Sequence, residues 1–215
     1  MDSISQIVLG AAVGEVVLGK KIGNKAMIWG AIGGTIPDLD VLASPILTEL
    51  QALAFHRGIT HSIFFSVFGG LFFGWAVNKL YSRKKEESPI KEVGFKMWSW
   101  FFFWTFLTHA LLDCFTMYGT QLFAPFSDYR VAFSTVAVAD FFYTLPFIFC
   151  LIMASRKVKN SSLRSRWNWL GIGWSCLYLM FTAVNKQYVS SVYKSQLADK
   201  KVAYERIIVG PTILT

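Results

Sequence analysis

Three histidines and three aspartates, all of residue types that bind divalent metals, gather in short stretches of the chain: Asp38, Asp40, His56, His61, His109 and Asp113. The sequence contains no other histidine. His109 and Asp113 are four residues apart in an apolar run, so on a helix both side chains face the same way. The set exceeds one tetrahedral zinc site and would suit two metals that share bridging carboxylates. The ligand mixture predicts Zn²⁺, with Mn²⁺ or Fe²⁺ as alternatives.

A metal held by these residues predicts hydrolytic chemistry. Its bound water, with a pKa lowered to about 7, would be the nucleophile. Either Asp140 or Asp128 would orient that water and act as the general base. Arg57 would clamp an anionic substrate, because guanidinium pairs bidentately with phosphate. Three hydroxyls near the motifs would hold the ligand carboxylates in place: Thr60, Thr116 and Thr120.

Several of these side chains also have a purely structural interpretation. Asp38 and Asp40 could cap a following helix, and Arg57 could form a salt bridge with either of them. Asp140 could cap its own helix, and Asp128 could end a turn. A single histidine at a membrane boundary is more often a hydrogen-bonded interfacial group, but three histidines beside aspartates favour a metal site.

The elements that must position these residues are apolar helices. The chain is 54% hydrophobic and only 16% charged, with a mean hydropathy of +0.45, whereas soluble domains carry about 25% charged residues. This composition predicts an all-α, polytopic membrane bundle. We expect a short helix pair at residues 4–18 and 26–36. Four transmembrane spans follow, each near the length that a bilayer requires: residues 59–81, 97–117, 136–154 and 167–185.

The basic residues predict the orientation of the bundle. The net charge of +8 falls in short tracts beside apolar runs, so we predict no nucleic-acid partner. Three tracts belong in the cytoplasm by the positive-inside rule: residues 20–25, 83–96 and 156–166. The intervening loops carry only Arg57 and Arg130 and would lie outside. Every candidate ligand then falls at an outer helix end, which predicts one site facing the extracytoplasmic side at lipid headgroup depth.

The end of the chain has a different pattern. We take residues 1–185 as a membrane-embedded domain that carries the metal site. Residues 186–215 would be an extracytoplasmic tail, which we interpret as the start of a truncated outer domain. Within it, Tyr188–Tyr193 and Lys201–Val209 alternate between apolar and polar residues, which predicts strands.

Taken together, the motifs resemble a known family. They are G-x-x-P-D-L-D, H-R-G-x-T-H-S, H-x-x-x-D followed by T-x-Y-G-T, and P-F-S, spread over roughly residues 1–150. This combination is similar to the YdjM-like membrane-bound metal-dependent hydrolases of the bacterial inner membrane. The family is distantly similar to zinc-dependent phospholipase C, which implies a phosphoester or lipid-type substrate. Many relatives carry a histidine where this chain has Gln6, so Glu15 is an alternative ligand.

The expected function is therefore metal-dependent hydrolysis at the extracytoplasmic face, with the lipid bilayer as the surrounding partner. The alternative is a non-enzymatic protein that binds a divalent metal, as a transporter or as a structural element. A transporter should place its carboxylates near the middle of the bilayer and show a repeat between its halves, and the sequence shows no such repeat. A structural site should be closed, with no open coordination position.

Overall fold

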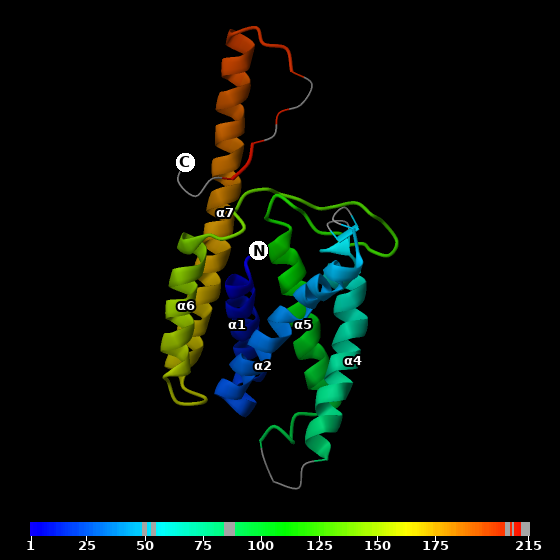
Figure 1. The fold of residues 1–215 in the computed structure, drawn as a ribbon. Coiled ribbons are helices and arrows are strands. Elements are labelled where there is room, and N and C mark those ends of the chain that lie inside the picture. Colours follow the sequence, from blue (N-terminus) through cyan, green and yellow to red (C-terminus); the bar gives the residue numbers. More distant parts are fainter. Residues whose placement is uncertain (49–50, 53–54, 84–88, 205–206, 208, 212–215) are drawn as a thin grey trace.

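The chain folds into a bundle of helices in this computed structural model, which describes residues 1–48, 51–52, 55–83, 89–204, 207 and 209–211. The described residues form α-helices and two 3₁₀ helices: α1 (Ser3–Ile22), α2 (Asn24–Thr35), η1 (Pro37–Ile46), η2 (Ile59–His61), α4 (Ile63–Ser82), α5 (Phe95–Asp113), α6 (Phe141–Ser155) and α7 (Ser162–Asp199). They contain no β-strand, only one isolated bridge between Thr120 and Val131. The all-helical class predicted from the sequence is confirmed (Figure 1).

A glycine seam joins α1 to α2, the predicted helix pair. Gly10 and Gly14 of α1 face Gly30 and Gly34 of α2, and a Cβ on Gly10 would meet the carbonyl oxygen of Gly30. Four-residue spacing places the two glycines of each helix on one face. Small residues let helix backbones approach closely, which explains the tight pair. The seam ends beside Gln6, whose backbone carbonyl lies against Gly34.

Aromatic side chains fix α5 against the other helices. Trp98, Phe101, Phe102 and Phe106 of α5 are fully or almost fully buried, and they pack with Leu18 of α1 in one core cluster. A second cluster joins the start of α1 to α6 and the end of α5. These two clusters hold the C-terminal end of α5 next to the N-terminal end of α1. That meeting point is where His109 and Asp113 lie.

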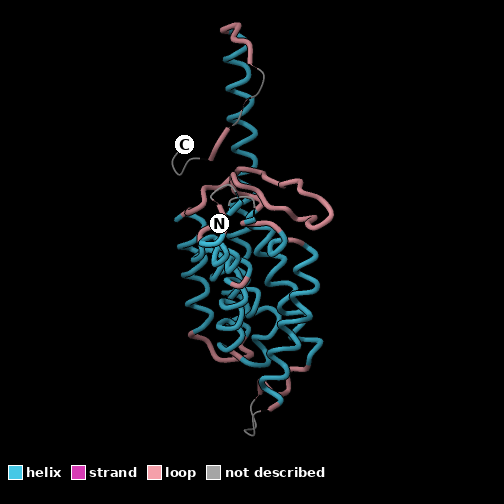
Figure 2. Tube along the Cα trace, turned by 45° about the vertical axis from the view of Figure 1, so that its right-hand side comes forward, coloured by secondary structure: helices cyan, strands magenta, loops and turns pink. Residues whose placement is uncertain are grey.

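The strand prediction for Tyr188–Tyr193 is wrong, because α7 continues through Asp199 as one helix of 38 residues. The segment from Trp174 to Asp199 contains neither glycine nor proline. Extending an existing helix adds a hydrogen bond for each residue ordered, whereas a new strand needs a partner. The part of Lys201–Val209 that the structure describes also contains no strand. Figure 2 shows the end of α7 projecting beyond the bundle.

The predicted four spans are not confirmed. Among the described residues, only α1 and α4 are long and apolar enough to cross a membrane, and α6 is apolar but shorter. Of these two, only α4 matches a predicted span, whereas α1 was predicted as part of the short helix pair and not as a span. The segment that forms α5 is less apolar than its phenylalanines suggest, because it also contains Lys96, His109 and Asp113.

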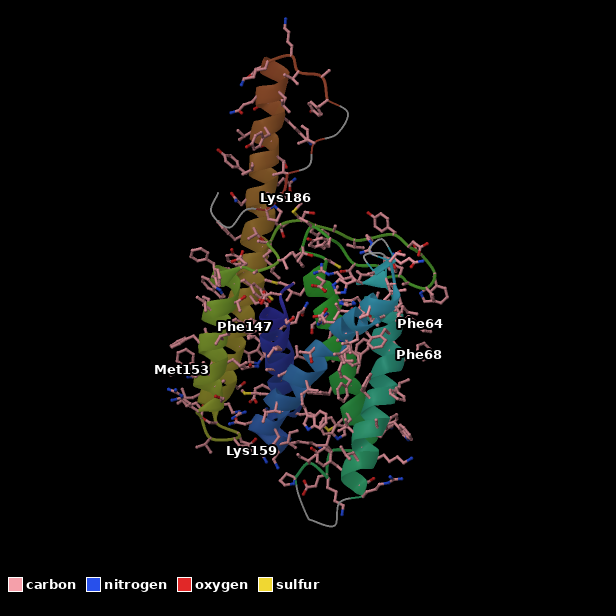
Figure 3. The ribbon with its side chains drawn as sticks, viewed as in Figure 1. Phe64, Phe68, Phe147, Met153, Lys159 and Lys186 are labelled. Carbon is pink, nitrogen blue, oxygen red and sulfur yellow. The ribbon has the colours of Figure 1, made fainter. Side chains whose placement is uncertain are left out.

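The basic loops and the loops with the candidate ligands lie at opposite ends of the bundle. The α1–α2 turn, the described part of the α4–α5 connection and the α6–α7 loop, which contains Lys159, lie at one end (Figures 1 and 3). The 3₁₀ helices and the segment between α5 and α6 lie at the other end (Figure 1). The described parts of the three predicted basic tracts therefore share one end, and the described motifs with the candidate ligands share the opposite end.

Candidate metal centre

Four predicted ligands converge on one point: Asp38, His61, His109 and Asp113. They come from η1, η2 and the last two turns of α5. The Nε2 atoms of His61 and His109 are 3.1 Å apart. The Oδ1 atom of Asp38 lies 3.2 Å from the first of these nitrogens and 3.4 Å from the second. The Oδ2 atom of Asp113 lies 3.4 and 3.5 Å from the same two atoms.

These separations match a tetrahedral metal site. With metal–ligand bonds of about 2.0–2.1 Å, tetrahedral geometry separates neighbouring ligand atoms by about 3.3–3.4 Å. Five of the six separations lie between 3.1 and 3.5 Å, and all four atoms lie within 4.8 Å of one another. Two imidazole nitrogens and two carboxylate oxygens form a ligand set that suits Zn²⁺ and also Mn²⁺ or Fe²⁺.

The hydrogen bond from His109 to α2 determines which of its nitrogens is free. Its Nδ1 lies 2.7 Å from the backbone carbonyl oxygen of Gly34. A carbonyl oxygen can only accept, so Nδ1 carries the proton and the lone pair of a neutral ring is on Nε2, the atom that faces the centre. Metal-binding histidines commonly have this arrangement. The glycine seam therefore positions a ligand through Gly34.

Thr60 has the same effect on His61. Its hydroxyl donates to Asp40 Oδ2 at 2.9 Å, so its oxygen accepts from His61 Nδ1 at 3.0 Å. The proton of a neutral His61 is thereby placed on Nδ1, and its Nε2 lone pair points at the centre. Two nitrogen lone pairs and two carboxylate oxygens then face one another, which is unfavourable without a cation between them.

Asp113 contributes one oxygen to the centre and binds the scaffold with the other. Its Oδ1 accepts a hydrogen bond from Gln6 Nε2 at 3.1 Å and forms an ion pair with the Met1 amino group. Arg57 lies 3.6 Å from the same oxygen. Asp113 is fully buried, and its Oδ2 has no hydrogen-bond partner among the described residues. A buried carboxylate oxygen without a donor is costly, and a metal ion would satisfy it.

The ionisation of the two ligands on the 3₁₀ helices suits metal binding. Burial would raise the pKa of Asp38, but the rings of His109 and His61 beside it outweigh this effect, so the pKa lies well below its usual value. Burial lowers the pKa of His61, although the neighbouring Asp38 carboxylate opposes the shift. At neutral pH the carboxylate is therefore charged and the imidazole neutral, which are the forms that bind metals.

The structure places the other two predicted ligands beside the centre rather than in it. Asp40 accepts from His56 Nδ1 at 2.8 Å and from the backbone N–H of Arg57 at 3.2 Å. The His56 ring centroid is 5.8 Å from that of His61. Among the described residues only one four-ligand group forms, so the expected second metal has no separate group of ligands there.

The predicted catalytic residues lie in three different settings. Arg57 is buried, donates to Thr116 and lies with its guanidinium carbon 5.4 Å from the centroid of the Tyr118 ring. Asp140 is the N-cap of α6, as its structural interpretation predicted, and Tyr178 donates to it at 2.7 Å. Asp128 lies exposed in the loop before α6. The catalytic roles of Asp140 and Asp128 remain predictions.

Gln6 and Glu15 have separate roles. Gln6 is buried, and its Nε2 also donates to the carbonyl oxygen of His109 at 3.3 Å. Gln6 lies in an apolar stretch of the sequence, where a buried side-chain amide needs hydrogen-bond partners. This position could have identified it as a residue near the site. Glu15 binds Arg164 through hydrogen bonds of 2.5 and 2.6 Å, so it does not join the four ligands.

Replacing Thr60 by valine is expected to weaken metal binding by about 10–100-fold, because outer-shell partners orient a ligand and set its basicity. The change removes the hydroxyl that connects His61 to Asp40 and nearly preserves the shape of the side chain. Metal titration of the detergent-solubilised protein measures the effect. Thr108→Val is the matched control, since among the described residues the Thr108 hydroxyl bonds only to the carbonyl oxygens of Trp104 and Thr105. Equal affinities of the two variants would contradict the orienting role.

Comparisons with known proteins support the resemblance seen in the sequence. The model of the family described as YdjM inner membrane protein matches residues 1–189. The uncharacterized protein YfhP of Bacillus subtilis (strain 168) is 27% identical over 162 residues, which cover 72% of this chain and 45% of that protein. The chain thus spans less than half the length of this relative. No solved structure matches the chain. The similarity to zinc-dependent phospholipase C has no support from these matches and remains a hypothesis.

Proposed function

This chain belongs to the YdjM inner membrane protein family, and we propose that it is a metal-dependent hydrolase whose site faces the extracytoplasmic side of the membrane. The observation that carries the proposal is the buried group of four converging ligand atoms, one of which has no hydrogen-bond donor. The elements that carry this group, η1, η2 and the last turns of α5, lie at the end of the bundle opposite the basic loops (Figure 1). The positive-inside rule favours cytoplasmic placement of those loops.

Two histidines and two aspartates would hold the metal: Asp38, His61, His109 and Asp113. When bound, a divalent ion of this kind supplies a water of lowered pKa and polarises a substrate oxygen. The chain itself keeps the ligands in their binding forms, through Gly34 for one histidine and Thr60 for the other. Gln6 and Arg57 hold the remaining oxygen of Asp113 and so orient its carboxylate.

The exposure of Asp38 supports a catalytic site. Its side chain is 24% exposed, whereas the side chains of the other three ligands are 0–1% exposed. The centre is therefore reached from the η1 side, and Asp38 is the ligand most easily displaced by a substrate. Catalytic metal sites keep such an accessible position.

A histidine beside the centre would act as the general acid–base that transfers a proton during hydrolysis. His56 is held by Asp40 through its Nδ1, and its side chain is 38% exposed. A carboxylate that fixes one ring nitrogen leaves the other available for general acid–base chemistry. Asp40 also connects through Thr60 to His61, so the proton carrier and the metal ligand share one support.

A phosphoester or lipid-type substrate fits the charge of the site. Arg57 is buried within reach of Asp113, and its Nε has no hydrogen-bond partner among the described residues. A buried guanidinium with a free donor is suited to an anionic oxygen. The end of the bundle that carries the site would lie near lipid headgroups.

A non-enzymatic metal-binding membrane protein is the second candidate. The observation in its favour is the number of ligands, since structural zinc sites use four protein side chains and catalytic sites usually use three plus water. In that case the ion would hold η1 and η2 against α5, and no turnover would follow.

Hydrolysis by the metal-loaded full chain tests the proposal. The probes are bis(4-nitrophenyl) phosphate and vesicles that contain phosphatidylglycerol and phosphatidylethanolamine, with products followed by absorbance and mass spectrometry. We expect turnover that falls at least about 100-fold in His56→Ala, the size of a general acid–base contribution, while bound metal is retained. Metal bound without turnover of any probe would reject the phosphoester hydrolase and favour the structural candidate.

A further inference from the structure

A cavity lies at the end of the bundle opposite the metal centre. It has a volume of about 570 Å³, within the range of small-molecule sites. Its walls come from the second half of α1, the loop before α7 and the first turns of α7. Both polar and apolar residues line it, among them Val16, Lys20, Ser165, Arg166, Asn168 and Trp169.

Asn168 supplies a buried acceptor that has no donor. Its side chain lines the cavity and the residue is 3% exposed. Its Nδ2 donates to the carbonyl oxygen of Ala12 at 3.0 Å, which can only accept, so the amide orientation is determined. Its Oδ1 has no hydrogen-bond partner among the described residues. A ligand with a hydroxyl group would satisfy this atom.

The charge of the cavity favours an anion. Glu15 and Arg164 neutralise each other through two hydrogen bonds, and Asn24 also accepts from Arg164 at 2.6 Å. Lys20 and Arg166 line the same cavity, are exposed, and form no ion pair within the part of the chain that the structure describes. The walls thus carry two positive charges that the described carboxylates do not neutralise.

The start of α7 adds donors to the same cavity. Ser161 caps the helix by accepting from the backbone N–H of Leu163. The other first-turn N–H groups of a helix have no partner within the helix, and the helix dipole favours an anion there. Ser165 lines the cavity one turn later, on the side of α7 that also carries Asn168.

An apolar rim completes the site. Val16 is 45% exposed and Trp169 is 56% exposed, and both line the cavity. Tryptophan is enriched where a protein meets the membrane interface. A ligand bound here would have its charged part among Lys20 and Arg166 and its apolar part along α1 and α7, toward the bilayer.

We propose that this cavity binds the headgroup of an anionic phospholipid, with phosphatidylglycerol as the occupant that its chemistry fits. Lys20, Arg166 and the first turn of α7 would bind the phosphodiester. A headgroup hydroxyl would donate to Asn168 Oδ1. The acyl chains would leave along Val16 and Trp169. This proposal does not depend on the metal centre or on hydrolysis.

Native mass spectrometry of the detergent-purified full chain tests the site. Dioleoyl phosphatidylglycerol is titrated against dioleoyl phosphatidylethanolamine and dioleoyl phosphatidic acid, which lacks the headgroup hydroxyls. We expect phosphatidylglycerol to bind tightest. In the double variant Lys20→Gln/Arg166→Gln its affinity should fall at least about tenfold, because two charge-assisted contacts are lost.

The control is Lys21→Gln/Lys25→Gln, which removes the same charge from exposed residues at the same end. We expect its affinity for phosphatidylglycerol to stay within about twofold of the wild type. Equal losses in the two double variants would show attraction to net charge and overturn the site. Equal binding of phosphatidylglycerol and phosphatidylethanolamine would also overturn it. Displacement of the lipid by millimolar inorganic phosphate would assign the cavity to free phosphate instead.

Discussion

Replacing His109 by alanine is expected to lower metal affinity by at least about 100-fold, the upper end of what a lost outer-shell contact costs, because one of four ligands is removed. The wild-type chain should hold about one divalent ion, as a single four-ligand group implies. Asp113→Asn should have the same effect while preserving the shape of the side chain. Elemental analysis of the detergent-purified protein measures the bound metal.

His56→Ala is the matched control for His109→Ala. It removes a histidine from the same end of the bundle, but His56 bonds to Asp40 and lies outside the four-ligand group. We expect this variant to retain its metal. If His56→Ala loses the metal as completely as His109→Ala, the four-ligand assignment is wrong and the wider six-residue set predicted from the sequence regains support.

Replacing Gly30 by alanine is expected to destabilise the protein by about 3 kcal/mol, the upper end of the range for overpacking. The new Cβ would meet the carbonyl group of Gly10 and the Cα of Ala11. These are backbone atoms of a helix, so no side chain can rotate to make room, and α1 must move away from α2. The shift would displace Gly34, whose carbonyl orients His109. Thermal unfolding in detergent should therefore show a lower Tm, with weaker metal binding.

Gly173→Ala makes the same chemical change where there is space. A Cβ at Gly173 would have no heavy atom of another residue within 4 Å outside its own helix. Because alanine is the better helix former, this variant should be neutral or more stable by up to about 1 kcal/mol. If Gly30→Ala proves as stable as Gly173→Ala, the close packing between α1 and α2 is not needed for the fold.

The residue types of the site could be identified from the sequence, but not their grouping. Imidazoles and carboxylates are common ligands of divalent metals, and all three histidines of this chain lie in the short motifs that contain the aspartates. The separation of Asp40 and His56 from the centre could not be foreseen. Asp38 and Asp40 are two residues apart, and the turn of η1 decides which of them faces His61 directly and which reaches it through Thr60.

Two interactions were beyond sequence reasoning for another reason. The bonds from Gln6 to Asp113 and from Gly34 to His109 join residues far apart in the chain. Both depend on the distance between α1, α2 and α5, which packing at the glycine seam and the aromatic core sets. The wrong strand prediction for Tyr188–Tyr193 had a local cause, because a weak alternation of apolar residues cannot outweigh the extension of a helix already formed.

The sequence by itself determined the helical class, the family and the residue types of a metal site, because composition and short motifs carry that information locally. The tertiary structure alone decided which four of the six ligands meet, which nitrogens face the centre, and where a buried acceptor lies without a donor. These depend on distances of a few ångströms between segments separated by tens of residues. Such distances follow from how closely the helices pack, and no single stretch of the chain encodes them.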